Sequence, residues 1–292
     1  MRTLVLVHGR SQQGKDPAAL KREWLEALQE GFAAADVALD LLDDKVRFPY
    51  YGDTLDQLVQ GRETPADVIV MGEGELDEEE KQFVAAAVAD AVLEEGVTDS
   101  QIRAELGDPN VEAGPQNWPW VIAAIRVLAK VPGLGAPTLA AVTRDVFHYL
   151  RRPGTARPID TGVLSALENE DECVVVAHSL GAVVAYNVLR RRAAGATWTV
   201  PSLVTVGCPL AVDPIVNALS PIGRPDGVAD WFNAFDPNDV VALHPLDEQH
   251  FGVQPPVENY DKVDNDTPNQ HGIKGYLSDP VVARRIYEAL LR

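Results

Sequence analysis

The sequence predicts an α/β protein with a mostly parallel, doubly wound sheet and an inserted helical cap, on three observations. Short apolar runs alternate with amphipathic helical patterns, as in sheets whose two faces are both covered by helices. The chain has 292 residues and is 46% hydrophobic, so it can bury a large core. One long stretch breaks the alternation with three consecutive helical patterns, as an insertion would.

The chain begins with a strand and a helix. TLVLV (3–7) is a short apolar run that predicts a buried strand. Asp16 and Pro17 have the residue types of an N-cap and a first helical position, and they open an amphipathic helix that ends near Gly31. In DVALDLL (36–42) every second residue is apolar, which predicts a second strand.

The stretch from 66 to 154 differs from the rest of the chain. ADVIVMG (66–72) fits either a further strand or an apolar turn of the insertion. Helical patterns follow at 76–95, 117–130 and 137–151. Three helices without a strand between them do not continue the alternation. We therefore predict that 66–154 form a helical cap or lid, inserted into a core made of 1–65 and 155–292.

After the insertion the alternation returns. Further strands are predicted at 173–177, 202–207 and 230–235. Helices are predicted at 161–169, 180–194, 212–219 and 280–291. These strands complete one parallel sheet, whose carboxyl ends meet at a single edge.

Charge and cysteine content narrow the class of partner. The chain carries 25 basic and 44 acidic residues, a net charge of -19, and such a surface repels nucleic acid and anionic membranes. No stretch is long and apolar enough to span a bilayer, and the N-terminus lacks the pattern of a secretory signal. Cys173 and Cys208 make neither a disulfide framework nor a metal set. We expect a cytoplasmic protein without a nucleic-acid partner or stable membrane association.

One serine lies where a strand pattern gives way to a helix pattern, in VVVAHSLGAVVAY (174–186). A nucleophilic serine is held on such a sharp turn, and the residues two before and two after it must be small. Ala177 and Gly181 meet that requirement around Ser179. The alternative is a serine that only caps the following helix. We expect His178 to be a packed neighbour and not the base, because adjacent side chains on such a turn diverge.

A serine hydroxyl needs a base within hydrogen-bond reach, and on a sheet of this kind the acid and then the histidine follow it in the chain. We select His271, in NQHGIKGYL, because its loop precedes the last helix and can reach the carboxyl edge of the sheet. His250 lacks such a context. His244, in ALHPL, follows a strand too closely to leave room for the acid before it.

Two aspartates follow the predicted strand 230–235, in FNAFDPNDVVAL. Asp239 precedes a small apolar run, so its carboxylate should be partly buried and should need a partner such as an imidazole N–H. Asp236 precedes a proline and can close a turn with its own side chain. We favour Asp239 as the acid that orients His271, and Asp236 is the alternative acid.

An acyl-transfer reaction also needs two N–H groups to bind the oxyanion. The N–H of Leu180, at the start of the serine's helix, is one candidate. The other candidate lies in HGRSQQG after the first strand, where Gly9 permits close approach of the backbone and Arg10 has the second N–H. The alternative is a glycine-containing turn with no further role.

The chain resembles the α/β-hydrolase superfamily, in its serine esterase and lipase-like branch. The resemblance lies in four segments that occur in this order: LVLVHGR, VVVAHSLG, NAFDPNDVVA and HGIKGYL. DPNDVVA is similar to the acid-bearing segment of lipases and DDHD-type phospholipases, and the resemblance implies that Asp239 is the catalytic acid. Ala177 departs from the family's usual glycine. The resemblance covers roughly 1–65 and 155–292, and it implies that no metal or organic cofactor is needed.

We expect a serine hydrolase that cleaves a carboxylic ester of a small acyl substrate, with a thioester or a lactone as alternative substrates. Two other functions stay open: acyl transfer or macrolactone formation with the same residues, and a catalytically idle binding module. Side chains expected to line a substrate pocket are His8, Tyr50, Tyr51, His178, Trp118 and Trp120. For the tyrosines and tryptophans, ordinary packing is the alternative. The sequence leaves chain length and oligomeric state open.

Overall fold

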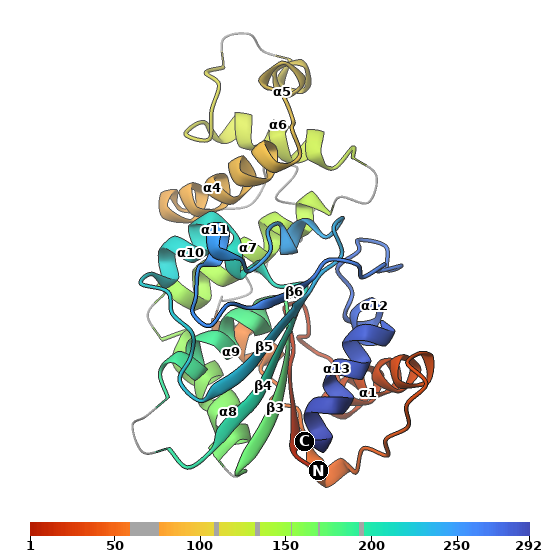
Figure 1. The fold of residues 1–292 in the computed structure, drawn as a ribbon. Helices are drawn as coiled ribbons and strands as arrows, with labels where there is room; N and C mark the ends of the chain where they lie inside the picture. Colours follow the sequence, from red (N-terminus) through yellow and green to blue (C-terminus); the bar gives the residue numbers. More distant parts are fainter. Residues whose placement is uncertain (59–75, 108–110, 132–134, 153, 169, 193–195) are drawn as a thin grey trace.

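The computed structural model describes residues 1–58, 76–107, 111–131, 135–152, 154–168, 170–192 and 196–292. Six strands of these residues form one sheet in the order β2-β1-β3-β4-β5-β6, and every neighbouring pair is parallel. Helices cover both of its faces (Figure 1). The protein is therefore an α/β protein with a parallel sheet. The segment 66–72 lies outside the described residues.

The four central strands of the sheet are mostly apolar runs with side chains buried on both faces, whereas the two edge strands are short and only partly buried. Their bounds are β1 Thr3–Val7, β2 Val46–Arg47, β3 Glu172–His178, β4 Thr199–Val206, β5 Val228–Ala234 and β6 Glu258–Tyr260. In β3, Val174 and Val176 face one helical layer, and Val175 and Ala177 face the other. A strand buried on two sides needs apolar residues at consecutive positions, which accounts for the unbroken runs in the sequence.

One helical layer contains the first helix of the chain and the last two. It is made of α1 (Pro17–Ala34), α12 (Ile273–Leu277) and α13 (Pro280–Leu291). Asp16 caps α1 by accepting hydrogen bonds from two backbone N–H groups, and Pro17 is its first residue, as predicted. The apolar faces of α1 and α13 pack on β1, β3, β4 and β5.

The other layer contains α2 (Gly52–Leu58), α8 (Ala156–Glu168) and α9 (Leu180–Arg190). Smaller helices beside it are α10 (Asp213–Leu219) and α11 (Glu248–Phe251). Short 3-10 turns of the described residues lie at η1 Asp43–Lys45, η2 Pro209–Ala211 and η3 Val240–Ala242. The core of the molecule is thus two apolar layers, one on each face of the sheet.

A third group of helices lies beyond the carboxyl ends of the strands (Figure 1). It comprises α4 (Glu78–Glu94), α5 (Asp99–Leu106), α6 (Trp118–Leu128) and α7 (Ala136–Arg151), which pack around an apolar cluster of their own. Val240, from the loop after β5, joins this cluster, and α7 contacts both α4 and α9. The helical group is therefore packed directly against the edge where the strands end.

The predicted strand at 36–42 is wrong. The strand that pairs with β1 is Val46–Arg47, with Leu4 opposite Val46. Val37, Leu39 and Leu41 do pack against the apolar cluster beneath α1, which explains their alternation. Alternating apolar residues indicate a half-buried extended segment, but they do not show that its backbone is paired with a neighbour.

The other predicted strands and helices are present, with ends shifted by a few residues. Elements that the prediction omitted are mostly short: α2, α11, α12 and β6. The omitted α5 carried a signal, because Thr98 and Gln101 form a capping box at its start. None of the described helices combines the length and the hydrophobicity that crossing a membrane requires.

Candidate active site

The strand order places two loops at a switch point of the sheet. Along the sheet the sequence order reverses between β1 and β3, so the chain leaves these strands toward opposite faces. A crevice forms at the carboxyl ends of such a strand pair, and it is the usual ligand site of a doubly wound sheet. His8 and Gly9 follow β1, and Ser179 follows β3. Both loops that the sequence singled out therefore begin at this point.

Ser179 is held in a strained backbone conformation between β3 and α9. Its φ is 56° and its ψ is -130°, a region that residues other than glycine rarely adopt. The turn is tight because α9 comes very close to β1: a Cβ on Gly181 would lie 2.4 Å from the carbonyl oxygens of Val7 and His8. The Ser179 side chain makes no capping hydrogen bond to α9, so it is not an ordinary N-cap.

His271 lies within hydrogen-bond distance of both Ser179 and Asp239. Its Nδ1 is 2.7 Å from Asp239 Oδ2, and its Nε2 is 2.8 Å from Ser179 Oγ. A carboxylate can only accept, so Nδ1 carries the proton and Nε2 of the neutral ring accepts from the serine hydroxyl. All three residues are buried, with exposed fractions of 1% for Ser179, 6% for His271 and 2% for Asp239. Such a chain can move a proton away from a hydroxyl in a largely dry environment.

The two aspartates after β5 have different partners. Asp236 Oδ1 accepts from Asn238 N at 2.7 Å, which is the local turn expected of an aspartate before proline. Its Oδ2 accepts from Asn265 N at 2.7 Å. Asp239 reaches His271 with Oδ2, while its Oδ1 accepts from Val241 N at 3.0 Å. The structure thus brings Asp239 to the histidine and uses Asp236 to tie two loops together.

A glycine after β4 makes room for the Asp239–His271 pair. Gly207 has a φ of 54°, in the left-handed region. A Cβ at this position would lie 3.1 Å from Asp239 Oδ2, 3.2 Å from His271 Nδ1 and 2.9 Å from Tyr276 Cε2. Both the backbone conformation and the absence of a side chain are therefore needed here.

The loop after β1 packs against the serine. A Cβ on Gly9 would lie 2.9 Å from Ser179 Cβ, so only glycine lets the two loops approach this closely. The Gly9 carbonyl accepts a hydrogen bond from His8 Nδ1 at 2.8 Å. In a trans peptide the N–H points away from the C=O, so this bond also sets the direction of the Arg10 N–H. The N–H of Leu180 opens α9 and has no acceptor within the helix.

His8 supports this loop from inside the core. Its Nε2 accepts from Tyr51 N at 3.1 Å, its ring stacks on Tyr51, and the Tyr51 hydroxyl donates to the His8 carbonyl. Burial lowers the pKa of His8 to about 4, so the imidazole is neutral at pH 7. His8 and Tyr51 were expected to line a substrate pocket. Both are buried and bonded to each other, and their part in a substrate pocket stays a prediction.

The remaining pocket candidates lie in three places. Tyr50 is half-buried, and its hydroxyl donates to Gln12 O at 2.5 Å. Trp120 is buried among the helices α4 to α7 and donates to Asp99, and Trp118 packs at the margin of the same cluster. Both tryptophans thus pack within the helical group, and their part in a pocket stays a prediction. His178 is buried at the site itself.

His178 lies against the base, as a packed neighbour. Its ring centroid is 4.8 Å from that of His271, and its Nε2 lies 2.8 Å from the His271 carbonyl, to which it donates. Burial and next the charge of His271 lower the pKa of His178 well below its ordinary value. A neutral His178 thus holds the backbone of the loop that carries His271.

The other two histidines after Ser179 lie elsewhere. His244 Nε2 is 2.9 Å from Asp90 of α4, and the His244 ring stacks on His250 with centroids 4.4 Å apart. Burial lowers the pKa of His244, but Asp90 and neighbouring carboxylates outweigh it and raise that pKa. These two rings join the core to the helical group, and neither is bonded to Ser179.

Sequence reasoning missed two side chains that hold the site. The Tyr276 hydroxyl donates to Asp239 Oδ2 at 2.5 Å. Asp145 of α7 accepts from Arg10 Nε at 2.5 Å, which ties the loop after β1 to the helical group. Tyr276 carried a weak signal, since it follows His271 by five residues and a buried tyrosine hydroxyl needs a partner. Asp145 carried none.

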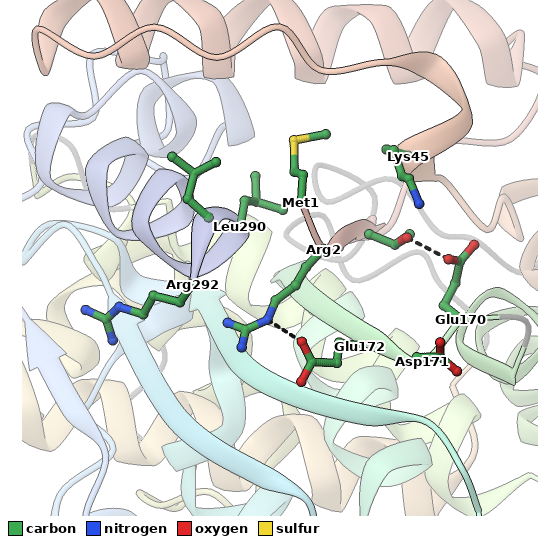
Figure 2. A pocket seen from close by; sticks show the side chains of 10 residues that line it. Met1, Arg2, Lys45, Glu170, Asp171, Glu172, Leu290 and Arg292 are labelled. Atoms are coloured by element: carbon green, nitrogen blue, oxygen red, sulfur yellow. Dashed lines mark hydrogen bonds and ion pairs between the residues drawn. The ribbon is translucent and has the colours of Figure 1, made fainter.

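A separate hollow lies at the opposite edge of the sheet, where the strands begin (Figure 2). Arg2 and Glu172 form an ion pair across it, and Thr3 donates to Glu170. Both ends of the chain contribute to its wall. Its lining contains no serine or cysteine beside a histidine, so the candidate active site is the group around Ser179.

Among the described residues, no group of three or more His, Cys, Asp and Glu side chains is arranged to hold a metal ion. No known protein family, curated protein or solved structure matches this chain. The case for a function therefore depends on the chemistry of the site and on the resemblance of its four segments.

Proposed function

We propose that the protein is a serine hydrolase with the α/β-hydrolase fold, which cleaves a carboxylic ester through an acyl-enzyme on Ser179. One observation carries the proposal: Ser179, His271 and Asp239, from three separate loops, form a continuous chain of hydrogen bonds at the switch point of the sheet. The strained turn at Ser179 supports it, because strain persists only where surrounding structure imposes it. The parallel sheet is compatible with this fold.

In the first half of the proposed reaction, His271 Nε2 takes the proton of Ser179 Oγ, and the oxygen attacks the carbonyl carbon of the ester. The carbonyl oxygen becomes an oxyanion, to which the N–H groups of Leu180 and Arg10 donate. Asp239 stabilises the imidazolium through its bond to Nδ1–H. The C–O bond to the alcohol then breaks, His271 returns the proton to the departing oxygen, and the acyl group stays on Ser179.

In the second half, water replaces the alcohol. His271 takes a proton from the water, and the resulting hydroxide attacks the acyl carbon. Collapse of this second oxyanion releases the carboxylic acid, and Ser179 Oγ recovers its proton from His271. Because a thioester or a lactone has the same electrophilic carbon, the same steps cleave these substrates too.

We assign α4 to α7 as the cap over this site. Asn269, in the loop of the base, donates to Thr138 near the start of α7 at 3.5 Å, and Val240 beside the acid packs among the same helices. Arg10 bonds to Asp145 of α7. The helical group therefore contacts the loops that carry Arg10, Asp239 and His271. Such a cover excludes water and strengthens the electrostatic interactions.

Labelling with a fluorophosphonate, followed by mapping of the modified residue, tests the proposal. The probe should modify Ser179, and Ser179→Ala should abolish labelling. Ser202→Ala is the matched control, because Ser202 is also buried and also lies by a carboxylate, Asp230, at 3.3 Å. Labelling that persists in Ser179→Ala would refute the nucleophile. An unmodified protein would instead favour the binding-module alternative.

The reaction itself is tested with a panel of esters of increasing acyl length. Release of the free acid supports hydrolysis. If an added alcohol or amine captured most of the acyl group, the product would be a new ester or amide, and acyl transfer would replace hydrolysis as the assigned reaction.

A further inference from the structure

The oxygen of Asp239 that faces His271 also accepts a second hydrogen bond. We propose that Tyr276 is a positioning residue, which holds the Asp239 carboxylate in place and limits how much of its negative charge acts on the imidazole. The inference rests on the proposed function, because it assigns Tyr276 a part in setting the reactivity of Ser179. Neither the sequence motif around Ser179 nor the chain order of serine, acid and histidine identifies Tyr276.

Tyr276 reaches the acid from the helix that follows the base. It lies on α12, five residues after His271, and its side chain is fully buried. Its hydroxyl donates to Asp239 Oδ2 at 2.5 Å and accepts from Asp236 N at 3.4 Å. The hydroxyl is thus held from one side by the backbone and aimed at the carboxylate on the other.

The direction of this bond follows from the chemistry of the two groups. An ionised carboxylate can only accept, so the phenol must donate. Burial, and next the negative charge of Asp239, raise the pKa of Tyr276 well above its ordinary value, so the phenol keeps its proton throughout the neutral range. Tyr276 is therefore a permanent donor to Asp239.

Two donors share one oxygen of Asp239. Oδ2 lies 2.7 Å from His271 Nδ1 and 2.5 Å from the Tyr276 hydroxyl, while Oδ1 accepts from Val241 N at 3.0 Å. These contacts fix the carboxylate at both oxygens. Each donor to a carboxylate also draws on its charge, so the phenol weakens the attraction between Asp239 and a protonated His271.

The other titratable groups near the base are fixed in one state or bonded elsewhere. His178 packs on His271 and is neutral, for the reason given above. Asp236 accepts from Asn238 and Asn265. Besides His271, the described side chain whose hydrogen bond ends on Asp239 is that of Tyr276. Removal of its one oxygen atom therefore changes the charge that His271 experiences.

The test compares Tyr276→Phe with the unsubstituted protein in fluorophosphonate labelling at a series of pH values. Without the phenol, Asp239 attracts the protonated imidazole more strongly and is itself easier to protonate. The acid limb is the fall in labelling rate at low pH, and both effects move it to higher pH. We expect its midpoint to shift upward by about half a pH unit to one unit, with a lower maximal rate.

Tyr149→Phe is a closely matched control. The Tyr149 hydroxyl is also buried, donates to Asp160 at 2.5 Å and accepts from Asn187 Nδ2 at 2.8 Å, but it lies between α7, α8 and α9. This variant loses the same kind of bond without touching Asp239. It should keep the acid limb of the unsubstituted protein, even if both variants lose thermal stability. An equal shift in both variants would overturn the inference.

A second substitution keeps the ring and the hydroxyl, and so guards against loss of folding. Replacement of Tyr276 by 3-fluorotyrosine makes the phenol a stronger donor, and the midpoint should then move to lower pH. Opposite shifts support the inference, since a merely structural role would not produce them. If the unsubstituted protein is labelled at Ser179 but neither change moves the acid limb, the inference alone fails. If Ser179 is never labelled, the proposed function fails and the inference with it.

Discussion

Replacing Gly207 with alanine should weaken the site without changing any of its three bonded side chains. Gly207 has a φ of 54°, and a Cβ there would lie 3.1 Å from Asp239 Oδ2 and 3.2 Å from His271 Nδ1. The alanine must therefore adopt a left-handed backbone and push the hydrogen-bonded pair aside. We expect losses of both stability and reactivity, from separate causes.

The loss of stability has two parts, and the loss of reactivity is a separate effect. The left-handed backbone costs an alanine about 1–2 kcal/mol of folding free energy. Crowding of a packed site by one methyl adds about 1–3 kcal/mol. A shift of a few tenths of an ångström in the base also spoils its alignment with Ser179, and such misplacements lower rates by about tenfold or more.

Gly96→Ala separates the two causes. Gly96 has a φ of 61°, but nothing lies within 4 Å of the position of its Cβ. Denaturant unfolding should show the backbone cost in both variants and the crowding cost in Gly207→Ala alone. Fluorophosphonate labelling should slow only in Gly207→Ala. If both variants were labelled at the same rate, the claim that Gly207 makes room for the pair would be refuted.

Three further predictions concern residues around the site. Asp239→Asn should slow labelling by about 10³–10⁴-fold, because its amide cannot serve as the same acceptor for His271, whereas Asp236→Asn should be labelled within a few-fold of the unsubstituted rate. Equal rates would contradict the assignment of Asp239, and slow labelling of Asp236→Asn alone would reverse it. Burial lowers the pKa of His8 from 6.5 to about 4, so between these values the unfolded chain takes up a proton that the folded protein does not. The free energy of unfolding should therefore fall by about 3 kcal/mol from pH 7 to pH 4. Denaturant titrations of His8→Gln should show a free energy of unfolding that depends less on pH, and an unchanged pH dependence would contradict this. Asp145→Asn should lower the free energy of unfolding by about 2 kcal/mol and slow labelling, since the Arg10 guanidinium loses its carboxylate partner. A variant with unchanged stability and labelling rate would show that this ion pair does not support the loop after β1.

Much of the architecture could be predicted because it depends on neighbours in the sequence. The cap at Asp16, the helix after Pro17 and the apolar run of β3 are local patterns, and the structure contains each of them. The segment 36–42 misled the prediction because one buried face produces the same alternation with or without a paired backbone. β6 has only three residues, too few for a periodic pattern to be recognised.

The groups that hold the site in place could not be predicted in the same way. Tyr276 and Asp239 are 37 residues apart, and Arg10 and Asp145 are 135 apart. The spacing of residues in a sequence does not state which loops the fold brings together. Gly207 is one of 22 glycines, and only the three side chains that lie against it show why this one has no Cβ.

The sequence by itself determined the residue types and where they fall: a serine between a buried strand and a helix, two aspartates after a later strand, and a histidine before the last helix. Each depends on local propensity and on hydrophobic periodicity, which neighbouring residues express without help from the rest of the chain. Only the tertiary structure decided that Asp239 and not Asp236 meets His271. The reason is geometric, because strand order and register set which side chains converge at one edge of the sheet.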